Sequence, residues 1–236
     1  MNLILLFESD FTSSNIAVIA DRRYQHISQI QKPEIGETLK VGLLNGHMGT
    51  GQVLAIDESS IKFQVILNSQ PPAPLPCTLL LALPRPKMLK RVLQTVSAMG
   101  VKQLYLINSY RVDKSYWSSP VLEKQINEHL LLGLEQAGDT VMPEVHLRKR
   151  FKPFVEDELP DIARNSRAIV AHPYLAKPCP TAENTLTTLA IGPEGGFIPY
   201  EIEKLNEAGF ESAHIGERIL RVETAVPALL SRLFPI

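Results

Sequence analysis

The chain has 236 residues, of which 44% are hydrophobic and 21% are charged, and its formal net charge at pH 7 is −1. This length allows one large domain or two small ones, with enough buried surface to fold without disulfides or metals. No apolar run approaches a membrane span. Residues 1–8 lack the basic start and cleavage site of a signal peptide, and we expect them to form a first strand. We therefore expect a cytoplasmic protein that binds no membrane.

The two cysteines, Cys77 and Cys179, lie in apolar or proline-rich surroundings. Neither belongs to a CxxC motif or lies near a pair of histidines, so we expect free thiols in a reducing compartment. The His, Cys and Asp residues show no spacing typical of a metal site, and we expect no metal.

Charge is distributed unevenly along the chain. Residues 1–75 carry 5 Lys and Arg against 7 Asp and Glu, residues 76–152 carry 12 against 6, and residues 153–236 carry 7 against 12. A basic middle in a nearly neutral protein predicts one cationic face for a polyanion. An ordinary lysine-rich surface explains the same pattern equally well.

Residues 1–70 are predicted to form a small β domain. Turn-forming residues separate four stretches of strand length, at 16–19, 38–44, 51–56 and 61–67. Their spacing of roughly ten residues suits a small barrel. A short helix is predicted at 25–31, and Arg22 and Arg23 beside Tyr24 and His26 could grip phosphates and stack on a base. The same residues could equally be an exposed helix start.

Four prolines in residues 71–76 predict a stiff, extended linker. Beyond it, strand-like and helix-like segments alternate, which predicts an α/β fold with a parallel sheet and helices on both faces. The predicted strands are 78–83, 103–107, 145–147, 168–171, 187–191 and 212–215. The predicted helices are 87–99, 121–137, 154–163, 200–208 and 224–234.

Three loops follow the last three predicted strands, at 172–174, 192–197 and 216–224. Ligands of parallel sheets bind at the carboxyl ends of strands, so we expect these loops to share one pocket. The glycines of 192–197 let a backbone approach a ligand closely, although a plain tight turn also explains them. No GxGxxG, P-loop or GxSxG motif is present, and such a pocket suits a flat heterocycle such as adenine better than a triphosphate.

Two C-terminal motifs carry a family resemblance. The sequence Ile-Gly-Pro-Glu-Gly-Gly at 191–196, followed by Gly-x-Arg-Ile-Leu-Arg-x-Glu-Thr-Ala at 216–225, resembles the RNA methyltransferases that methylate N3 of a uridine in 16S ribosomal RNA. These enzymes belong to the SPOUT superfamily of knotted methyltransferases. The resemblance covers the whole chain, with further matches at 94–101, 135–138 and 172–173. The C-terminal motifs are specific, whereas the N-terminal match is one of pattern.

The resemblance implies a PUA-like β-barrel at 1–70, a linker at 71–76 and a SPOUT domain with a parallel sheet and a C-terminal trefoil knot at 77–236. It implies S-adenosylmethionine as the cofactor, 16S rRNA or the small ribosomal subunit as the partner, and a homodimer through the knot domain. A methyltransferase of this architecture acting on another RNA or on a ribose 2′-hydroxyl is one alternative. The other is a non-catalytic RNA-binding factor of ribosome assembly, against which the intact C-terminal motifs argue.

The resemblance also implies roles for particular residues. Arg221 would stabilise negative charge on a uracil carbonyl as the N3 proton departs, and Glu223 would orient Arg221. The bare sequence allows a structural ion pair between these two residues instead. RNA would lie across the basic middle, including residues 148–152, with expected contacts from Arg22, Arg23, Arg85, Lys87 and Arg91. S-adenosylmethionine would be held by His172, Pro173, Ile191, Gly192, Pro193, Glu194, Gly195, Gly196, Ile215, Gly216, Ile219, Leu220, Thr224 and Ala225.

Some residues depart from the family pattern. Ile198 stands where the family usually has a serine that caps the next helix, and Pro227 lies in the last predicted helix. Thr95 and Ala98 replace residues of a lysine-containing segment in the family, which could weaken RNA binding or alter the substrate. Among the residues of the glycine-rich loop, we expect Glu194 to hold the loop's shape or the dimer partner and not to act in catalysis.

Overall fold

The computed structural model describes residues 2–174 and 176–235. The chain divides into two compact units. Unit 1 consists of Met1–Ala73 with Leu131–Met142, and unit 2 consists of Pro74–Leu130 with Pro143–Ile236. Residues 131–142 are predicted to belong to the C-terminal domain, whereas their packing groups them with the first 73 residues.

Unit 1 is built on a six-stranded sheet with the order β1-β4-β5-β6-β3-β2. Strand β1 pairs parallel with β4 and the other pairs are antiparallel. Successive side chains of a strand point to opposite faces of the sheet, so every second residue of β6 enters the core. Ile61, Phe63 and Val65 are buried, whereas Lys62 and Gln64 between them are exposed. The strands are β1 (Ile4–Leu6), β2 (Phe11–Ser13), β3 (Ile16–Ile19), β4 (Thr38–Leu43), β5 (Met48–Ile56) and β6 (Ile61–Ser69).

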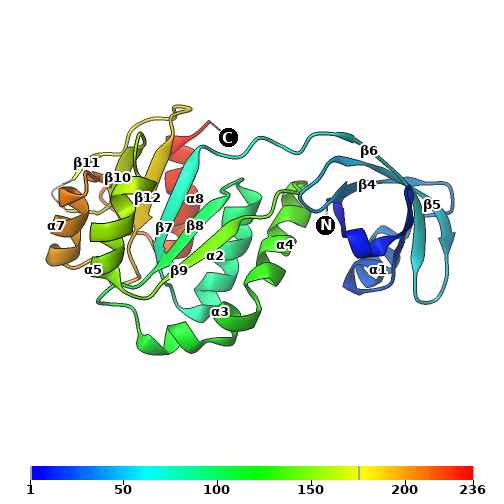
Figure 1. Ribbon diagram of the computed structural model, residues 1–236, viewed down its shortest axis with the longest axis horizontal. Coiled ribbons are helices and arrows are strands. Elements are labelled where there is room, and N and C mark those ends of the chain that lie inside the picture. The colour runs from blue at the N-terminus through cyan, green and yellow to red at the C-terminus, as the bar shows by residue number, and fades with distance from the viewer. Residues whose placement is uncertain (1, 175, 236) are drawn as a thin grey trace. The chain divides into compact units, whose positions relative to one another are not determined.

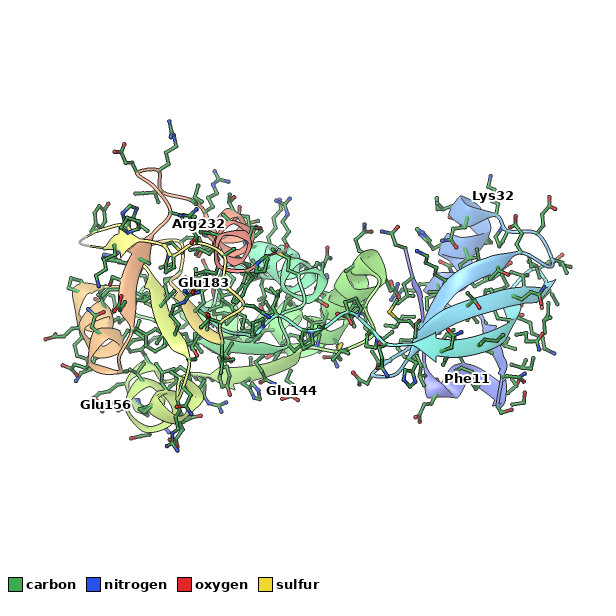
Figure 2. All side chains as sticks on the ribbon, turned by 90° about the horizontal axis from the view of Figure 1, so that it is seen from above. Phe11, Lys32, Glu144, Glu156, Glu183 and Arg232 are labelled. Atoms are coloured by element: carbon green, nitrogen blue, oxygen red, sulfur yellow. The ribbon has the colours of Figure 1, made fainter. Side chains whose placement is uncertain are left out.

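A helical segment connects β3 to β4. Helix α1 (Arg22–His26) begins at Asp21, whose side chain accepts the backbone N–H of Arg23, and it continues into the π-helical turn η2 (Ile27–Gln31). The turn ends at Lys32, which is labelled in Figure 2. Its φ of 49° is left-handed. This segment confirms the helix predicted at 25–31.

The segment Leu131–Met142 completes unit 1 because it covers apolar side chains of β1. Leu3, Leu5 and Leu134 form a buried cluster. The backbone N–H groups of Asn2 and Leu3 donate to the carbonyl of Glu135 at 2.9 and 3.0 Å. Without this segment, the outer face of β1 would be exposed.

Unit 2 contains a seven-stranded, fully parallel sheet with the order β11-β13-β10-β12-β7-β8-β9. All five residues of β12 are buried, as expected for a central strand covered on both faces. Cys77 of β7 and Cys179 are buried free thiols. The strands are β7 (Cys77–Ala82), β8 (Gln103–Ile107), β9 (Glu144–Arg148), β10 (Arg167–Ala171), β11 (Lys177–Pro178), β12 (Thr187–Ile191) and β13 (Glu211–His214).

Helices cover both faces of this sheet (Figure 1). Helices α2 (Pro86–Ala98) and α8 (Val222–Leu233) pack together on one face. Helix α7 (Pro199–Glu207) lies on the other face, against the helical segment of residues 151–162. The structure thus confirms the α/β fold with a parallel sheet covered by helices on both faces, and it shows a mixed sheet in unit 1.

Most predicted elements are present, and the exceptions have local causes. The predicted helix 121–137 is divided at Gln125 into α3 (Pro120–Lys124) and α4 (Ile126–Ala137). The predicted helix 154–163 is interrupted because Pro160 lacks the N–H that a regular helix needs. It consists of α5 (Phe151–Pro153), the π-helical turn η4 (Phe154–Glu158) and α6 (Leu159–Ile162). Strands β2 and β11 and the 3₁₀ helices η1 (Glu8–Asp10) and η3 (Lys114–Ser118) have no counterpart among the predicted elements.

Within residues 2–174 and 176–235, no helix is long and apolar enough to cross a membrane.

Candidate functional site

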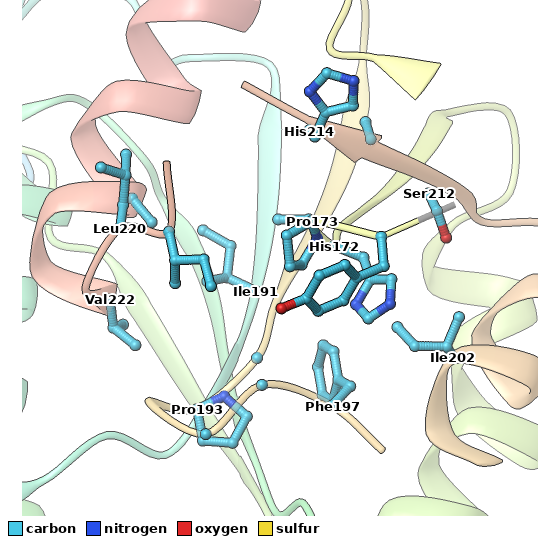
Figure 3. A pocket seen from close by; sticks show the side chains of 18 of the residues that line it. His172, Pro173, Ile191, Pro193, Phe197, Ile202, Ser212, His214, Leu220 and Val222 are labelled. Atoms are coloured by element: carbon cyan, nitrogen blue, oxygen red, sulfur yellow. The ribbon is translucent and has the colours of Figure 1, made fainter. Parts of the chain in front are cut away.

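A cavity of about 1140 Å³ lies in unit 2 at the carboxyl ends of β10, β12 and β13. These strands are neighbours in the sheet, so the loops that follow them lie side by side. The three loops that the sequence predicts to converge all line the cavity, together with helices α7 and α8. Figure 3 shows Leu220 and Val222 on one side of it and Ile202 and Ser212 on the other.

The structure brings together nearly all residues expected to bind the cofactor. Thr224 is the exception: it is exposed in the first turn of α8, and its N–H donates to the carbonyl of Arg221. The expected residues that line the cavity are His172, Pro173, Ile191, Gly192, Pro193, Glu194, Gly195, Gly196, Ile215, Gly216, Ile219, Leu220 and Ala225.

The glycine-rich loop after β12 turns back tightly on itself. The N–H of Gly196 donates to the carbonyl of Pro193 at 2.8 Å, and Gly196 has a φ of +72° that disfavours other residues. A Cβ on Gly192 would lie 3.0 Å from the backbone nitrogen of Phe197. The loop therefore needs glycine for its own shape, and it presents backbone to the cavity.

Glu194 joins this loop to the start of helix α2. Its Oε1 accepts the backbone N–H of Arg85 at 3.1 Å. Arg85 is the N-cap residue of α2, so the carboxylate lies where the positive end of the helix dipole favours it. This contact agrees with a shape-holding role for Glu194.

Arg111, which follows β8, also lines the cavity, although it is not among the predicted site residues. Its guanidinium donates a hydrogen bond to the carbonyl of Gly195. The neighbouring residues are held by Glu201 of α7, a carboxylate that is only 2% exposed. Glu201 accepts hydrogen bonds from the Ser109 hydroxyl at 3.1 Å and the Tyr110 N–H at 2.7 Å.

Glu201 also compensates for the atypical Ile198. Ile198 is the N-cap of α7 and has no side-chain acceptor, but Oε2 of Glu201 accepts the Ile198 N–H at 3.0 Å. This is the acidic half of a capping box, and the spacing of three residues is its sequence signal. The helix start is therefore satisfied without the serine that the family usually has.

Arg221 and Glu223 flank the cavity without lining it. Arg221 is the exposed N-cap of α8, next to the lining residues Leu220 and Val222. Glu223 lies partly buried in the first turn, and its Oε2 is a buried atom without a partner among the described residues. The structure places no ion pair between the described side chains of Arg221 and Glu223, so the orientation of one by the other stays a prediction.

The expected RNA contacts fall into two groups. Arg85, Lys87 and Arg91 are exposed at the start of α2 and along it. The side chain of Arg22 is 43% exposed and makes two hydrogen bonds with the Glu135 carboxylate, at 2.8 and 2.9 Å.

The expectation that Arg23 contacts RNA is wrong, because Arg23 is only 2% exposed. Its guanidinium donates to the carboxylates of Asp10 and Asp21 and to the carbonyl of Leu5, and it lies over the ring of Phe7. Burial alone would lower the pKa of Arg23, but the bonds to Asp10 and Asp21 raise it. Arg23 therefore holds unit 1 together and cannot bind a phosphate.

The positive charge among the residues that line the cavity comes from Arg111 and Arg218 and not from His172. Burial lowers the pKa of the His172 imidazole from 6.5, so the ring is neutral at pH 7. Carboxylates of Glu203 and Glu207 also line the cavity. In residues 2–174 and 176–235, no group of three or more His, Cys, Asp or Glu residues could hold a metal ion.

Residues 71–234 match the family described as the RNA methyltransferase domain. The chain is 29% identical to the ribosomal RNA small subunit methyltransferase E of Treponema pallidum, over 95% of this chain and 88% of that protein. It is 24% identical to ribosomal RNA small subunit methyltransferase E 1 of Borreliella burgdorferi, over 97% of this chain and 95% of that protein. A solved ribosomal RNA small subunit methyltransferase E from Neisseria gonorrhoeae, bound to S-adenosyl methionine, has a similar fold. The TM-score is 0.74 at 18% identity, covering 98% of this chain and 95% of that one.

Proposed function

Because the chain belongs to the RNA methyltransferase domain family, we propose that it uses S-adenosylmethionine to methylate N3 of a uridine in 16S ribosomal RNA. One observation carries the proposal: three loops from neighbouring parallel strands enclose a cavity walled by glycine backbone and apolar side chains. The relatives named as small-subunit rRNA methyltransferases support the choice of RNA.

The cavity fits this cofactor in size and in charge. About 1140 Å³ is ample for a molecule of this size, and Ile191, Phe197 and Leu220 offer apolar surface to an adenine. A neutral His172 does not repel a sulfonium cation. The carboxylates of Glu194, Glu203 and Glu207, which attract one, outnumber the lining cations Arg111 and Arg218. When bound, S-adenosylmethionine supplies an activated methyl group.

The remaining chemistry belongs to residues of the chain. Uracil N3 carries a proton at neutral pH and pairs through it, so the base must be unpaired or flipped out of its helix. We assign Arg221 to the negative charge that develops on a uracil carbonyl as this proton leaves, a contribution of roughly 3 kcal/mol for a well-placed donor. Its exposed position beside the lining residues Leu220 and Val222 supports this role.

Glu223 is assigned to orient Arg221 and to serve the path of the departing proton. Its buried, unpartnered Oε2 is an acceptor that the described residues leave free. Such an atom is costly unless it has a function or a partner that arrives with the substrate.

The finer architecture belongs to the same proposal. We propose that residues 1–70 form a PUA-like barrel, that 71–76 are the linker, and that 77–236 form a SPOUT domain with a trefoil knot at its three loops. A homodimer through this domain is supported by a group of exposed apolar side chains at the cavity, namely Tyr174, Ile215, Ile219 and Leu220. RNA is expected to contact Arg22, Arg85, Lys87 and Arg91. The buried Arg23 is not expected to contact it.

Thermal unfolding with added S-adenosylmethionine tests the cofactor. A ligand at about 100 times its Kd stabilises the folded protein by roughly 2.7 kcal/mol, which raises Tm measurably. ATP is the control. It shares the adenine with S-adenosylmethionine but carries a triphosphate, and the sequence has no P-loop motif to bind one. A rise in Tm with S-adenosylmethionine and none with ATP supports the proposal, and no rise with either contradicts it.

A further inference from the structure

The loops after β8 and β9 form a second surface beside the cavity. The N–H of Asn108, directly after β8, donates to the carbonyl of Arg148 at 2.8 Å. Trp117 of η3 donates its indole N–H to the Asn108 side chain at 2.9 Å, and the ammonium of Lys149 lies 5.8 Å from the centre of the Trp117 ring. The two loops are thus one continuous structure.

This surface joins the cavity through direct contacts. Arg111 of the β8 loop reaches the carbonyl of Gly195, and the ring of Phe151 lies 6.2 Å from that of Phe197. Both Gly195 and Phe197 line the cavity. A ligand lying on the two loops would therefore extend to the place where the proposed reaction occurs.

Only part of the positive charge on this surface is neutralised by carboxylates. Arg148 pairs with Glu158 and Lys152 with Glu156. Among the side chains that the structure describes, those of Arg111, Lys149 and Arg150 make no ion pair with an acid, and all three are exposed. The acid of the β8 loop, Asp113, is engaged by the N–H and hydroxyl of Ser115. Exposed cations gathered in this way suit a polyanion.

Exposed aromatic rings lie among these cations. The side chain of Tyr110 is 79% exposed while its backbone N–H is fixed on Glu201. Trp117 is partly exposed. An exposed ring on a rigidly held backbone is suited to stacking on nucleobases. Unpaired nucleobases expose their faces for such stacking, whereas those of a regular RNA duplex do not.

We propose that Tyr110, Arg111, Trp117, Lys149 and Arg150 form a binding surface for single-stranded RNA, which holds the unpaired nucleotides next to the target nucleotide. This inference rests on the proposed function, since it takes the neighbouring cavity as the place of methyl transfer. Arg111, Lys149 and Arg150 bind phosphates, and Tyr110 and Trp117 stack on bases. The substrate is therefore an unpaired segment, entering from the side of β8 and β9.

The test measures binding of a short fluorescent oligouridine to the full chain by anisotropy at several salt concentrations, alone and annealed to oligoadenosine. Single-stranded RNA should bind more tightly than the duplex. Lys149→Ala/Arg150→Ala should weaken binding about ten-fold at low salt and reduce the salt slope by roughly 1.4 for two phosphate contacts. Tyr110→Ala should weaken binding about ten-fold with the slope unchanged.

The control is Lys124→Ala/Lys177→Ala, which removes two exposed cations of unit 2 outside the proposed RNA surface, of which Lys177 pairs with Glu211. It should change the affinity less than two-fold, and unchanged Tm values will show that all variants fold. The proposed surface is contradicted if the Lys149/Arg150 variant binds like the control, if Tyr110→Ala has no effect, or if the duplex binds better. Calorimetry with S-adenosylmethionine separates the two proposals: failure of the wild-type protein to bind it overturns the proposed function, whereas the oligouridine titration decides the RNA surface by itself.

Discussion

The backbone N–H of Tyr110 donates a 2.7 Å hydrogen bond to Oε1 of Glu201, a side chain that is 2% exposed. Through this bond, helix α7 on one wall of the cavity holds the β8 loop on another. Arg111 is the next residue, and it contacts the glycine-rich loop at Gly195. A single buried carboxylate therefore fixes the relative position of three segments around the cavity.

Removing this carboxylate should be costly to stability. Glu201→Ala leaves the Ser109 hydroxyl and two backbone N–H groups without their acceptor, so we expect a loss of roughly 3 kcal/mol in the free energy of unfolding. Glu201→Gln should lose less, because its amide oxygen still accepts. Urea unfolding measures both, with the exposed neighbour Glu203→Ala as the control. A Glu201→Ala variant as stable as the control would contradict the role.

Arg23 gives a stability prediction in unit 1. Arg23→Ala removes the cation that pairs with Asp10, whose side chain is 10% exposed, and with the half-exposed Asp21. Breaking a buried pair such as Arg23–Asp10 costs about 3–5 kcal/mol. The exposed Lys62→Ala is the control and should be nearly neutral. Urea unfolding measures the free energy of unfolding of both variants. An Arg23→Ala variant as stable as Lys62→Ala would contradict the structural role of Arg23.

Acid should weaken the same cluster. Burial alone would raise the pKa of Asp21, but hydrogen bonds from Arg23 lower it below 3.8. Because the folded-state pKa is depressed, the stabilisation is present above the unfolded value of 3.8 and is lost as the pH falls through the folded value. The acid dependence of unfolding should therefore be smaller in Arg23→Ala than in the wild-type chain.

Comparing alanine variants of two glycines distinguishes an effect of backbone strain from an effect on cofactor binding. Gly196 and Gly209 have φ of +72° and +89°, and each has open space where a Cβ would lie. Alanine at either position should cost about 1 kcal/mol of stability, because both become strained. Only Gly196 lines the cavity, so calorimetry should show weaker S-adenosylmethionine binding for Gly196→Ala and unchanged binding for Gly209→Ala. Equal affinities in the two variants would contradict the assignment of the loop.

Cofactor affinity should depend on the protonation of His172. Burial lowers the pKa of this imidazole below 6.5, so the ring is neutral at pH 7 and above. Acidification through that pKa creates a cation in the cavity, which repels the sulfonium. The Kd for S-adenosylmethionine should stay constant from pH 7 upward and rise at lower pH, more steeply in the wild type than in His172→Asn. Parallel pH profiles would count against this explanation.

Much of the fold follows from local patterns in the sequence. The apolar stretch of β12 marks a buried central strand, and Gly100 and Gly138 mark two helix ends through their positive φ. The convergence of the three loops follows from parallel strands, which share a carboxyl edge. What these patterns do not specify is the neighbour order of β13, β10 and β12, because that order depends on packing between distant segments.

The errors have a common physical origin in long-range contacts. The Arg111 side chain is held in the cavity wall by a hydrogen bond to the carbonyl of Gly195, which lies 84 residues away in the sequence. No local motif in the sequence identifies Arg111 as a site residue. Leu134 is part of a helix by its periodicity, yet its buried partners Leu3 and Leu5 belong to the start of the chain. The sequence predicts an RNA contact for Arg23 because two adjacent arginines, Arg22 and Arg23, are typical of a phosphate-binding site. The adjacent Asp21 is the local sign that Arg23 instead forms an internal ion pair.

The most direct measurement of the central claim is mass spectrometry of small-subunit RNA from a strain that lacks the gene. One uridine should lose a methyl group on N3, and the wild-type gene should restore it. Arg221→Ala should not restore the methyl group although the purified variant still binds S-adenosylmethionine, and the exposed Arg164→Ala should restore it. Unchanged methylation in the deletion strain, a lost methyl on a ribose hydroxyl, or full restoration by Arg221→Ala would contradict the account.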